Sequence, residues 1–418
     1  MTDYAELADY EWLAGDEAAA ILTDVSQRND SLLAATSRLR KQLSAMRAHL
    51  LLELAELRTR ATAKFAHADR MFFTGKLLEQ ATDGWIAGYK AGRFTGRGPI
   101  ADLCCGIGGD LLALSKVGPT IGVDCDPIAI CLAAANGRAV LPQEAAAKIS
   151  LQSCHVEQIE LSDYAAWHLD PDRRPNGSRT TSLEWSSPSL AAIEKLLVVA
   201  PTAAIKLAPA AEVPADWTDR CEQEWISRDR ECRQLVAWHG GLAKSTGWRR
   251  ATVLNREGTV LTTIVGLPNR VVPISTRIGQ FIFDPDPALL AAHLTGELAA
   301  KHGLERISAG IAYLTGDAAL IDPALACFEI DEVLPFERRR LASHLHERGI
   351  GTLEIKKRSI DVDPERLRRE LKLRGDKSAM LILTPHNAKQ IAILAHRVPA
   401  ASPTSDLRPL ASSYASRL

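Results

Sequence analysis

The sequence lacks the features that carry a protein into or across a membrane. No apolar run approaches the ~20 residues that a membrane-spanning helix needs. The first residues are also acidic, with Asp3, Glu6 and Asp9 where a secretory signal peptide is basic. We therefore expect a cytoplasmic protein that does not associate with membranes.

The cysteines lack the spacing of a metal site and of a secreted disulfide framework. The chain has 8 cysteines among 418 residues, and none forms a C-x-x-C pair. Several of them lie close together in the sequence: Cys104, Cys105, Cys125, Cys131 and Cys154. We expect reduced thiols that pack as small apolar residues, and no bound metal.

Neither sign of charge predominates, since 50 Lys and Arg balance 51 Asp and Glu to a net charge of -1. A length of 418 residues with 46% hydrophobic content predicts a globular protein of two or three domains. Composition shifts divide the chain into a helical N-terminal region over 1–98, an α/β domain over 99–267, a second α/β domain over 268–398 and a tail over 399–418. The tail is rich in Pro, Ser and Ala, and we expect it to be disordered.

Two long helices are expected in the N-terminal region. The stretch 31–58 contains no Pro or Gly and carries an apolar face of Leu43, Met46, Leu50, Leu54 and Leu57. We interpret it as a helix that packs on the next domain. A second helix is expected to begin at Thr74, a suitable N-cap, and to run to about residue 94.

The most informative segment of the chain, 99–110, is an apolar strand that runs into a glycine-rich turn. A helix over 111–117 follows, and a second strand over 120–125 again ends in acidic residues. This order of elements predicts a βαβ nucleoside-binding unit. Gly106 and Gly108 let backbone N–H groups approach a ligand, and Asp124 can accept hydrogen bonds from both hydroxyls of a ribose.

One carboxylate, Asp102, selects among nucleoside ligands. Placed just before the turn, it would repel the pyrophosphate of NAD or FAD. The third glycine of the dinucleotide motif G-x-G-x-x-G is also missing, because Leu111 stands there. A ligand with a ribose and a cationic amino-acid end fits these residues, and S-adenosylmethionine has both, together with a sulfonium.

From Asp102 to Gly109 the sequence resembles the first motif, D-x-F-x-G-x-G-G, of class I S-adenosylmethionine-dependent methyltransferases, with Cys104 in the place of the aromatic residue. The resemblance implies a doubly wound, seven-stranded α/β sheet and S-adenosylmethionine as the cofactor. It also implies that the cofactor is held by Asp102, Cys104, Gly106, Gly108, Asp124 and Asp126. The predicted strands agree with this family's sheet, which ends in an antiparallel hairpin: 100–105, 120–125, 148–154, 165–170 and 202–208, then 221–227 and 231–238.

The resemblance gives a cofactor role to three further residues. In methyltransferases of the trimethylguanosine synthase type, to which the chain is distantly similar, an aromatic residue and a Ser or Thr fold over the cofactor. Phe73 and Thr74 match these two residues. Alternatively, Phe73 is the hydrophobic staple and Thr74 the N-cap that fix the start of a helix. His155 stands where many relatives have an acid that binds the adenine amino group. It can hydrogen-bond a ring nitrogen, or it can be an edge histidine without a ligand.

The fourth strand ends in Asp170-Pro171-Asp172-Arg173, at the edge of the sheet where substrate meets the cofactor. Amino-methylating enzymes of this class carry N/D-P-P-Y/F here, and this chain keeps the acceptor and the proline but not the aromatic residue. The resemblance implies that Asp170 orients the acceptor amine or hydroxyl, while Pro171 fixes the direction of the chain after it. Stacking on a base would then need Arg173 or an aromatic residue from elsewhere in the chain. We expect Arg173 and Arg174 to hold phosphate. Alternatively, the two arginines are solvated residues of an ordinary turn.

The second α/β domain is basic, with 13 Lys and Arg against 8 Asp and Glu between residues 335 and 377, a net charge of +5. The segments 336–340, 351–358 and 379–384 resemble in their order the THUMP-like domain of a group of bacterial methyltransferases. THUMP domains bind RNA in tRNA-modifying enzymes. The resemblance implies RNA binding, for which we expect Lys356, Lys357 and Arg358 to contact phosphate. Alternatively, these charges form a solvated face.

The sequence thus predicts a methyltransferase that acts on tRNA or another structured RNA. It consists of a helical N-terminal region, a class I core and a smaller α/β THUMP-like domain. Two alternatives stay open: a cofactor-binding RNA scaffold or chaperone with weak catalysis, and a methyltransferase whose acceptor is a small molecule or a protein.

Overall fold

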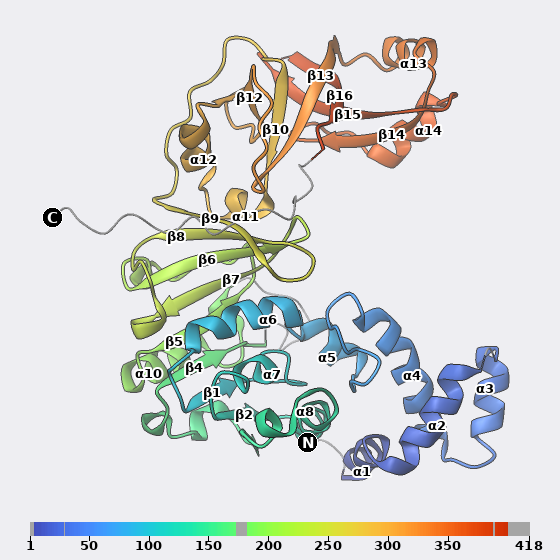
Figure 1. Ribbon diagram of the computed structural model, residues 1–418, viewed down its shortest axis with the longest axis vertical. Coiled ribbons are helices and arrows are strands. Elements are labelled where there is room, and N and C mark those ends of the chain that lie inside the picture. The colour runs from blue at the N-terminus through green and yellow to red at the C-terminus, as the bar shows by residue number, and fades with distance from the viewer. Residues whose placement is uncertain (1–3, 29, 173–181, 388, 400–418) are drawn as a thin grey trace, which may run out of the picture. The chain divides into compact units, whose positions relative to one another are not determined.

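A computed structural model describes residues 4–28, 30–172, 182–387 and 389–399 of the chain (Figure 1). The chain divides into two compact units, Met1–Pro268 and Asn269–Leu418. Arg173, Arg174 and the expected tail from residue 400 onward lie outside the described residues. Among the described helices, none is both long enough and apolar enough to cross a membrane.

Short helices form the first part of unit 1: α1 (Tyr4–Leu13), α2 (Asp16–Gln27), α3 (Leu32–Leu39), α4 (Ala45–Ala61), α5 (Gly75–Gln80) and α6 (Gly84–Ala91). The prediction of a single helix over 31–58 was wrong, because a turn separates α3 from α4. Ser44 begins α4, since its side chain accepts a hydrogen bond from the N–H of Arg47 at 3.2 Å. Leu50, Leu54 and Leu57 are buried, whereas Met46, in the first turn of α4, is 45% exposed.

The helix expected over 74–94 is also divided. Thr74 caps α5, as its hydroxyl accepts from the N–H of Leu77 at 3.2 Å. Asp83 then begins α6, with Oδ1 accepting from Trp85 and Ile86 at 3.0 and 3.4 Å. The continuous helix does not form, because the Asp83 side chain takes the backbone N–H groups of Trp85 and Ile86. In a continuous helix, these N–H groups would bond to carbonyls of the preceding turn.

The sheet of unit 1 has the strand order β3-β2-β1-β4-β5-β7-β6-β8-β9. Its strands are β1 (Ile100–Leu103), β2 (Thr120–Asp124), β3 (Ile149–Ser153), β4 (Ala166–Leu169), β5 (Ala203–Leu207), β6 (Cys221–Arg228), β7 (Glu231–His239), β8 (Arg249–Leu254) and β9 (Val260–Gly266). The first five strands are parallel, and β7 is antiparallel to both β5 and β6. This is the expected arrangement of a doubly wound sheet that ends in an antiparallel hairpin.

Two strands follow the expected seven, so the described sheet has nine. β8 pairs in parallel with β6, and β9 pairs antiparallel with β8. Every residue of β6 is buried, and an uncovered edge strand of that kind would invite association with another chain. The partly exposed strand β9 ends the sheet instead.

The remaining helices of unit 1 are α7 (Leu111–Leu114), α8 (Pro127–Val140), α9 (Gln143–Ala146) and α10 (Leu190–Val199). One apolar core joins the N-terminal helices to α8, including Leu54, Phe73 and Leu132. Asn136 of α8 adds polar contacts, since its side chain accepts from the N–H of Phe72 at 2.7 Å and donates to the carbonyl of Ile107 at 3.0 Å. The N-terminal region is therefore built into the nucleoside-binding unit.

The sheet of unit 2 has the order β11-β12-β10-β13-β16-β15-β14. Its strands are β10 (Phe281–Pro285), β11 (Glu305–Arg306), β12 (Leu314–Gly316), β13 (Leu325–Pro335), β14 (Ile350–Lys357), β15 (Lys377–His386) and β16 (Lys389–Arg397). Its helices are α11 (Pro287–Ala291), α12 (Thr295–His302), α13 (Arg338–Glu347) and α14 (Pro364–Leu371). Leu341 and Leu345 of α13 and Leu367 and Leu371 of α14 pack on Leu353 of β14 in one core. The sequence did not predict β10, β13 or β16.

A buried ion pair joins three segments of unit 1. Arg228, at the end of β6, contacts Asp83 at 2.6 Å, and both side chains are almost fully buried. The same guanidinium donates to the carbonyls of Ala63 and Arg256 at 2.7 Å and lies over the Trp85 ring at 4.5 Å. Arg228 is therefore one of the residues that tie the N-terminal helices to the sheet.

We expect Asp83→Ala to lower the free energy of unfolding by about 3 to 5 kcal/mol, because it leaves the Arg228 charge buried without its partner. Urea unfolding followed by circular dichroism measures the change. Asp24→Ala is the matched control, since Asp24 pairs with Arg28 and Arg38 at the surface, where such pairs contribute little. Similar unfolding midpoints for Asp83→Ala and the wild type would contradict the assignment.

Candidate cofactor and active site

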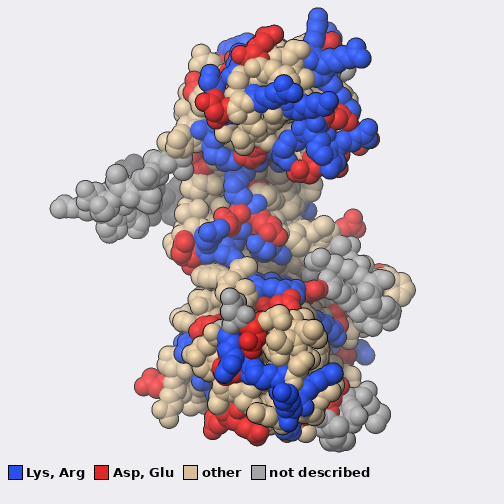
Figure 2. All heavy atoms as spheres, turned by 90° about the vertical axis from the view of Figure 1, so that its right-hand side faces the viewer, with Lys and Arg blue, Asp and Glu red and all other residues tan. Residues whose placement is uncertain are grey.

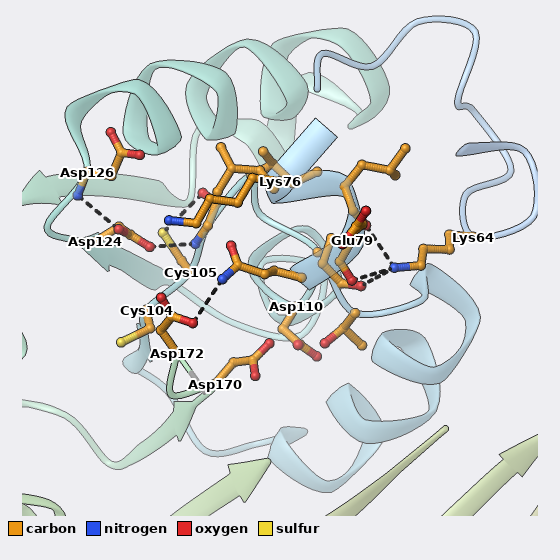
Figure 3. A pocket seen from close by; sticks show the side chains of 18 of the residues that line it. Lys64, Lys76, Glu79, Cys104, Cys105, Asp110, Asp124, Asp126, Asp170 and Asp172 are labelled. Carbon is orange, nitrogen blue, oxygen red and sulfur yellow. Dashed lines mark hydrogen bonds between the residues drawn. The ribbon is translucent and has the colours of Figure 1, made fainter. Parts of the chain in front are cut away.

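The carboxyl ends of β1, β2 and β4 meet at a cavity of about 670 Å³ (Figure 3). Parallel strands bring the residues that follow them to one edge of a sheet. Segments of the N-terminal helices complete the wall. The charged residues that line the cavity are Arg60, Lys64, Lys76, Glu79, Asp102, Asp110, Asp124, Asp126, Asp170, Asp172 and Arg233.

The loop after β1 has a backbone conformation that side chains rarely adopt. The φ angles of Cys104, Gly106 and Gly108 are +55°, +54° and +90°. Glycine adopts this region freely, whereas Cys104 must be held there by its surroundings, and such residues concentrate at functional sites. Gly109 lies so close to Thr82 that a Cβ would meet the Thr82 carbonyl oxygen at 3.0 Å. The glycines thus let the segment between α5 and α6 close on the loop.

Asp124 and Asp126 sit at the end of β2 and line the cavity. Asp124 accepts the N–H of Gly106 on Oδ2 at 2.9 Å and the N–H of Asp126 on Oδ1 at 3.0 Å. Burial raises the pKa of Asp124, and these two hydrogen bonds oppose the rise. Each carboxylate oxygen has a further lone pair, so Asp124 can still accept two hydroxyls. Asp126 caps α8, accepting the N–H of Ile128 at 2.9 Å.

Asp102 points from β1 into a buried polar network that the sequence did not reveal. Its Oδ1 lies 2.7 Å from Nδ1 of His168 on β4, and Nε2 of His168 lies 3.0 Å from Nζ of Lys90 on α6. Lys90 also contacts Asp110, before α7, at 2.7 Å. His168 was passed over as a strand residue, because apolar neighbours on either side gave no signal that its side chain met two charges.

Asp170 reaches the cavity from the end of β4, with its carboxylate 2.5 Å from Nζ of Lys206 on β5. Pro171 and Asp172 line the same cavity, and Gln80 donates to Asp172 at 3.0 Å. Paired backbone hydrogen bonds between Asp172 and Ser187, at 2.8 and 2.9 Å, hold this loop. Lys206 was missed, because predicting a strand over 202–208 does not show which of its side chains reaches the end of the neighbouring strand β4.

The structure puts four predicted cofactor residues outside the described lining of the cavity: Phe73, Thr74, Gly108 and His155. Phe73 is buried in the core, with its ring 5.8 Å from that of Phe65. Thr74 caps α5, so the pair matches the alternative of staple and cap. His155 is exposed, and its backbone N–H donates to the Gln158 side chain at 3.1 Å. We therefore leave Phe73, Thr74 and His155 out of the site, which Lys76 and Leu77 of α5 line in their place. Gly108 shapes the loop without lining the cavity.

The residues of the cavity fit S-adenosylmethionine. The volume is typical of a site for a ligand of this size. Asp124 suits the ribose hydroxyls, and Oδ2 of Asp102 is buried without a hydrogen-bond partner among the described residues, where a ligand ammonium would satisfy it. Within the described part of the chain, no group of three His, Cys, Asp or Glu side chains could hold a metal ion.

Cationic side chains line the cavity as well, and the charge of Lys76 acts on Asp124. Arg60, Lys76 and Arg233 are exposed, and Lys64 is half-buried. The Lys64 ammonium donates to the carbonyls of Leu78, Glu79 and Ala81 at 2.8 to 3.1 Å, and burial lowers its pKa to about 8. Its role is therefore to hold the end of α5. We call the other three, Arg60, Lys76 and Arg233, the cationic rim.

In unit 2, two of the three predicted RNA contacts are engaged within the protein. Lys356 and Arg358 lie 3.0 and 2.7 Å from the buried carboxylate of Asp284. Although burial favours the neutral acid, these two cations hold the pKa of Asp284 below its usual value. Lys357 alternates to the exposed side of β14. Figure 2 shows Lys and Arg gathered on the face of this unit that carries α13 and α14, where Arg338, Arg339, Arg340, Arg366 and Arg369 are exposed.

If Asp124 holds the ribose, Asp124→Ala should weaken binding of S-adenosylmethionine by roughly 2–3 kcal/mol, because charge-assisted hydrogen bonds are lost. Isothermal titration calorimetry measures the affinity, and circular dichroism checks the fold. Glu157→Ala, at an exposed acid after the adjacent strand β3, should bind the cofactor as the wild type does. Unchanged affinity in Asp124→Ala would remove Asp124 from the site.

Known proteins resemble both units of the chain. Residues 325–397 match the family model described as THUMP domain-like. Uncharacterized S-adenosylmethionine-dependent methyltransferases of Mycobacterium tuberculosis, from strains CDC 1551 and H37Rv, are each 33% identical over 350 residues, which are 81% of this chain and 93% of theirs. The crystal structure of a putative methyltransferase from Porphyromonas gingivalis W83 superimposes with a TM-score of 0.75 over 96% of this chain and 100% of that one.

The structural match is 18% identical in sequence and shows the fold alone. The mycobacterial relatives extend over most of both chains, so they show the family. The motif after β1, the acids of the cavity and these relatives agree on one cofactor. The chain belongs to the S-adenosylmethionine-dependent methyltransferases and carries a THUMP-like domain at its C-terminal end.

Proposed function

We propose that this methyltransferase acts on RNA, with the acceptor nucleotide held in the cavity next to Asp170. The observation that carries the proposal is the charge pattern of the cavity, in which buried carboxylates occur together with the exposed cationic rim. An ammonium and a ribose suit the carboxylates, whereas a polyanion suits the rim. A small neutral acceptor would need no such rim.

The THUMP-like domain supports the same substrate class. The matched residues include β13, β14, β15 and β16 together with α13 and α14. Exposed arginines on these two helices provide contacts that are independent of base sequence, as expected for recognition of RNA by its shape and backbone. Of the three phosphate contacts expected at Lys356, Lys357 and Arg358, only Lys357 is exposed on the surface, since the other two pair with Asp284.

S-adenosylmethionine supplies an electrophilic methyl group, so the protein has mainly to orient the acceptor and exclude water. Asp170 can accept a hydrogen bond from the acceptor N–H or O–H and aim its lone pair at the methyl carbon. Lys206 fixes the Asp170 carboxylate from β5 and offsets its charge. Gln80 holds Asp172 from the opposite wall. We therefore assign Asp170 the role of orienting the acceptor.

We expect the purified protein to transfer tritium from S-adenosyl-[methyl-3H]methionine into total small RNA of a strain that lacks this protein. Asp170→Ala should lose about 100-fold or more of this activity, because the acceptor is no longer oriented, with little change in cofactor affinity. Asp170→Asn keeps an acceptor oxygen and should retain much of the rate.

Transfer into a protein or metabolite fraction instead of RNA would contradict the proposed substrate. Equal transfer by the wild type and Asp170→Ala would contradict the assigned residue and leave the substrate assignment standing. If Asp170 acts as a general base, Asp170→Asn and Asp170→Ala should lose activity to the same extent.

Replacing the cationic rim by Gln, in the triple variant of Arg60, Lys76 and Arg233, should weaken RNA binding and reduce its dependence on salt. Each lost phosphate contact lowers the slope of log affinity against log salt by roughly 0.7, so the three together should lower it by roughly 2. Filter binding between low and moderate salt measures the slope. The control triple variant replaces Arg40, Lys41 and Lys116, which are exposed cations outside the cavity lining. Equal slopes in both triple variants would show that the rim does not touch RNA.

A further inference from the structure

Four titratable side chains are buried beneath the glycine loop and take no direct part in the proposed transfer. Lys90, Asp102 and His168 are each 1% exposed, and Asp110 is 6% exposed. Buried charges are costly unless each is paired and hydrogen-bonded. A cluster of this kind at a binding site therefore needs an explanation in terms of the ligand.

The hydrogen bonds of the cluster have fixed directions. The ammonium of Lys90 can only donate, so Nε2 of His168, at 3.0 Å, is the acceptor. The imidazole is then neutral with its proton on Nδ1, which donates to Oδ1 of Asp102 at 2.7 Å. Asp110 accepts from Lys90 at 2.7 Å and holds the ammonium in place. Lys90 thus fixes the tautomer of His168 that donates to Oδ1 of Asp102.

The other oxygen of Asp102 is left for a ligand. Oδ2 is buried, has no hydrogen-bond partner among the described residues, and belongs to a residue that lines the cavity. One ammonium, two carboxylates and a neutral imidazole leave the cluster with a net charge of -1. The neighbouring charges, Asp170 and Lys206, neutralise each other at 2.5 Å. One ligand cation would balance the cluster.

We propose that Lys90 and His168 are positioning residues that keep Asp102 ionised, with Oδ2 available to the cavity, so that the site selects the ammonium end of the cofactor. This inference concerns cofactor recognition and does not depend on the proposed RNA substrate. It assigns a role to a lysine and a histidine that lie on α6 and β4, away from the glycine motif.

The expected protonation behaviour supports this role. Burial raises the pKa of Asp102, and the hydrogen bond from His168 opposes that rise. Burial lowers the pKa of Lys90, and Asp110 opposes the fall. Without the His168 donor, the pKa of Asp102 rises further, so Asp102 is protonated at a higher pH and no longer attracts a cation. Affinity for a cationic ligand should then recover as the pH increases.

The test compares two probes that differ only in the ammonium group: S-adenosylhomocysteine and its desamino analogue. In His168→Gln, whose amide reaches the position of Nε2, the preference for the amino probe should fall about 10-fold or more at neutral pH, as expected for a lost hydrogen bond to a charged group. In His168→Asn, whose amide can donate from the position of Nδ1, the preference should be largely retained. The desamino probe should bind the wild type and both variants alike.

Calorimetry of each probe across a pH series gives the ratio of affinities, which does not depend on the fraction of folded protein. His239→Gln is the control, because His239 is a buried histidine of the same sheet that packs on Trp217 outside the cavity. A double variant, Lys90→Met with Asp110→Asn, removes both charges together and should lower the ratio as His168→Gln does. An unchanged ratio in His168→Gln, an equal loss for both probes, or an equal loss in His168→Gln and His168→Asn would overturn the proposal.

Discussion

The parallel pairing of β1 with β4 is the constraint on which the site depends. Its register sets Asp102 directly opposite His168, and Leu103 opposite Leu169. A shift by one residue would turn every side chain of one strand to the other face of the sheet, so Asp102 would lose both its histidine partner and the cavity. The same pairing brings Asp170, the residue after β4, to the end of β1, where its N–H donates to the carbonyl of Leu103 at 3.2 Å.

Gathering carboxylates at one edge of a sheet creates an electrostatic problem that buried lysines solve. Lys90 comes from α6 and Lys206 from β5, and each lies within 3 Å of an aspartate. These pairs reduce the repulsion among the acids while leaving Oδ2 of Asp102 without a hydrogen-bond partner among the residues that the structure describes. Part of the remaining negative charge is thus left at Asp102, where a ligand ammonium would fit.

The N-terminal helices contribute a large part of the wall of the cavity. Arg60 and Lys64 come from the end of α4 and the turn after it, and Lys76 and Gln80 come from α5. The interruption between α5 and α6 makes this possible, because Asp83 restarts the helix and lets Thr82 reach Gly109. Asp83 also pairs with Arg228 at the end of β6. This ion pair holds the interruption between α5 and α6 in place.

Much of the core could be predicted because its signals are local. The strands that end in Asp102 and Asp124 are short apolar runs before acids, and glycines mark the turn between them. The helix breaks at Ser44 and Asp83 were missed, because capping competes with helix continuation by small free energies that apolar periodicity does not reveal. The strands β8 and β9 were not predicted, because their position in the sheet follows from pairing of β8 with the buried strand β6 and not from a local sequence pattern.

The sequence by itself determined the nucleoside-binding unit, the acids that suit S-adenosylmethionine and the order of the strands that carry them. The tertiary structure alone decided which charges meet. His168 lies opposite Asp102, Lys206 beside Asp170, and Lys356 and Arg358 on Asp284. These partners are separated by between 36 and 74 residues, and no local pattern links them. Coulomb interactions depend on distance in space, and folding brings residues that are far apart in the sequence to within 3 Å of one another.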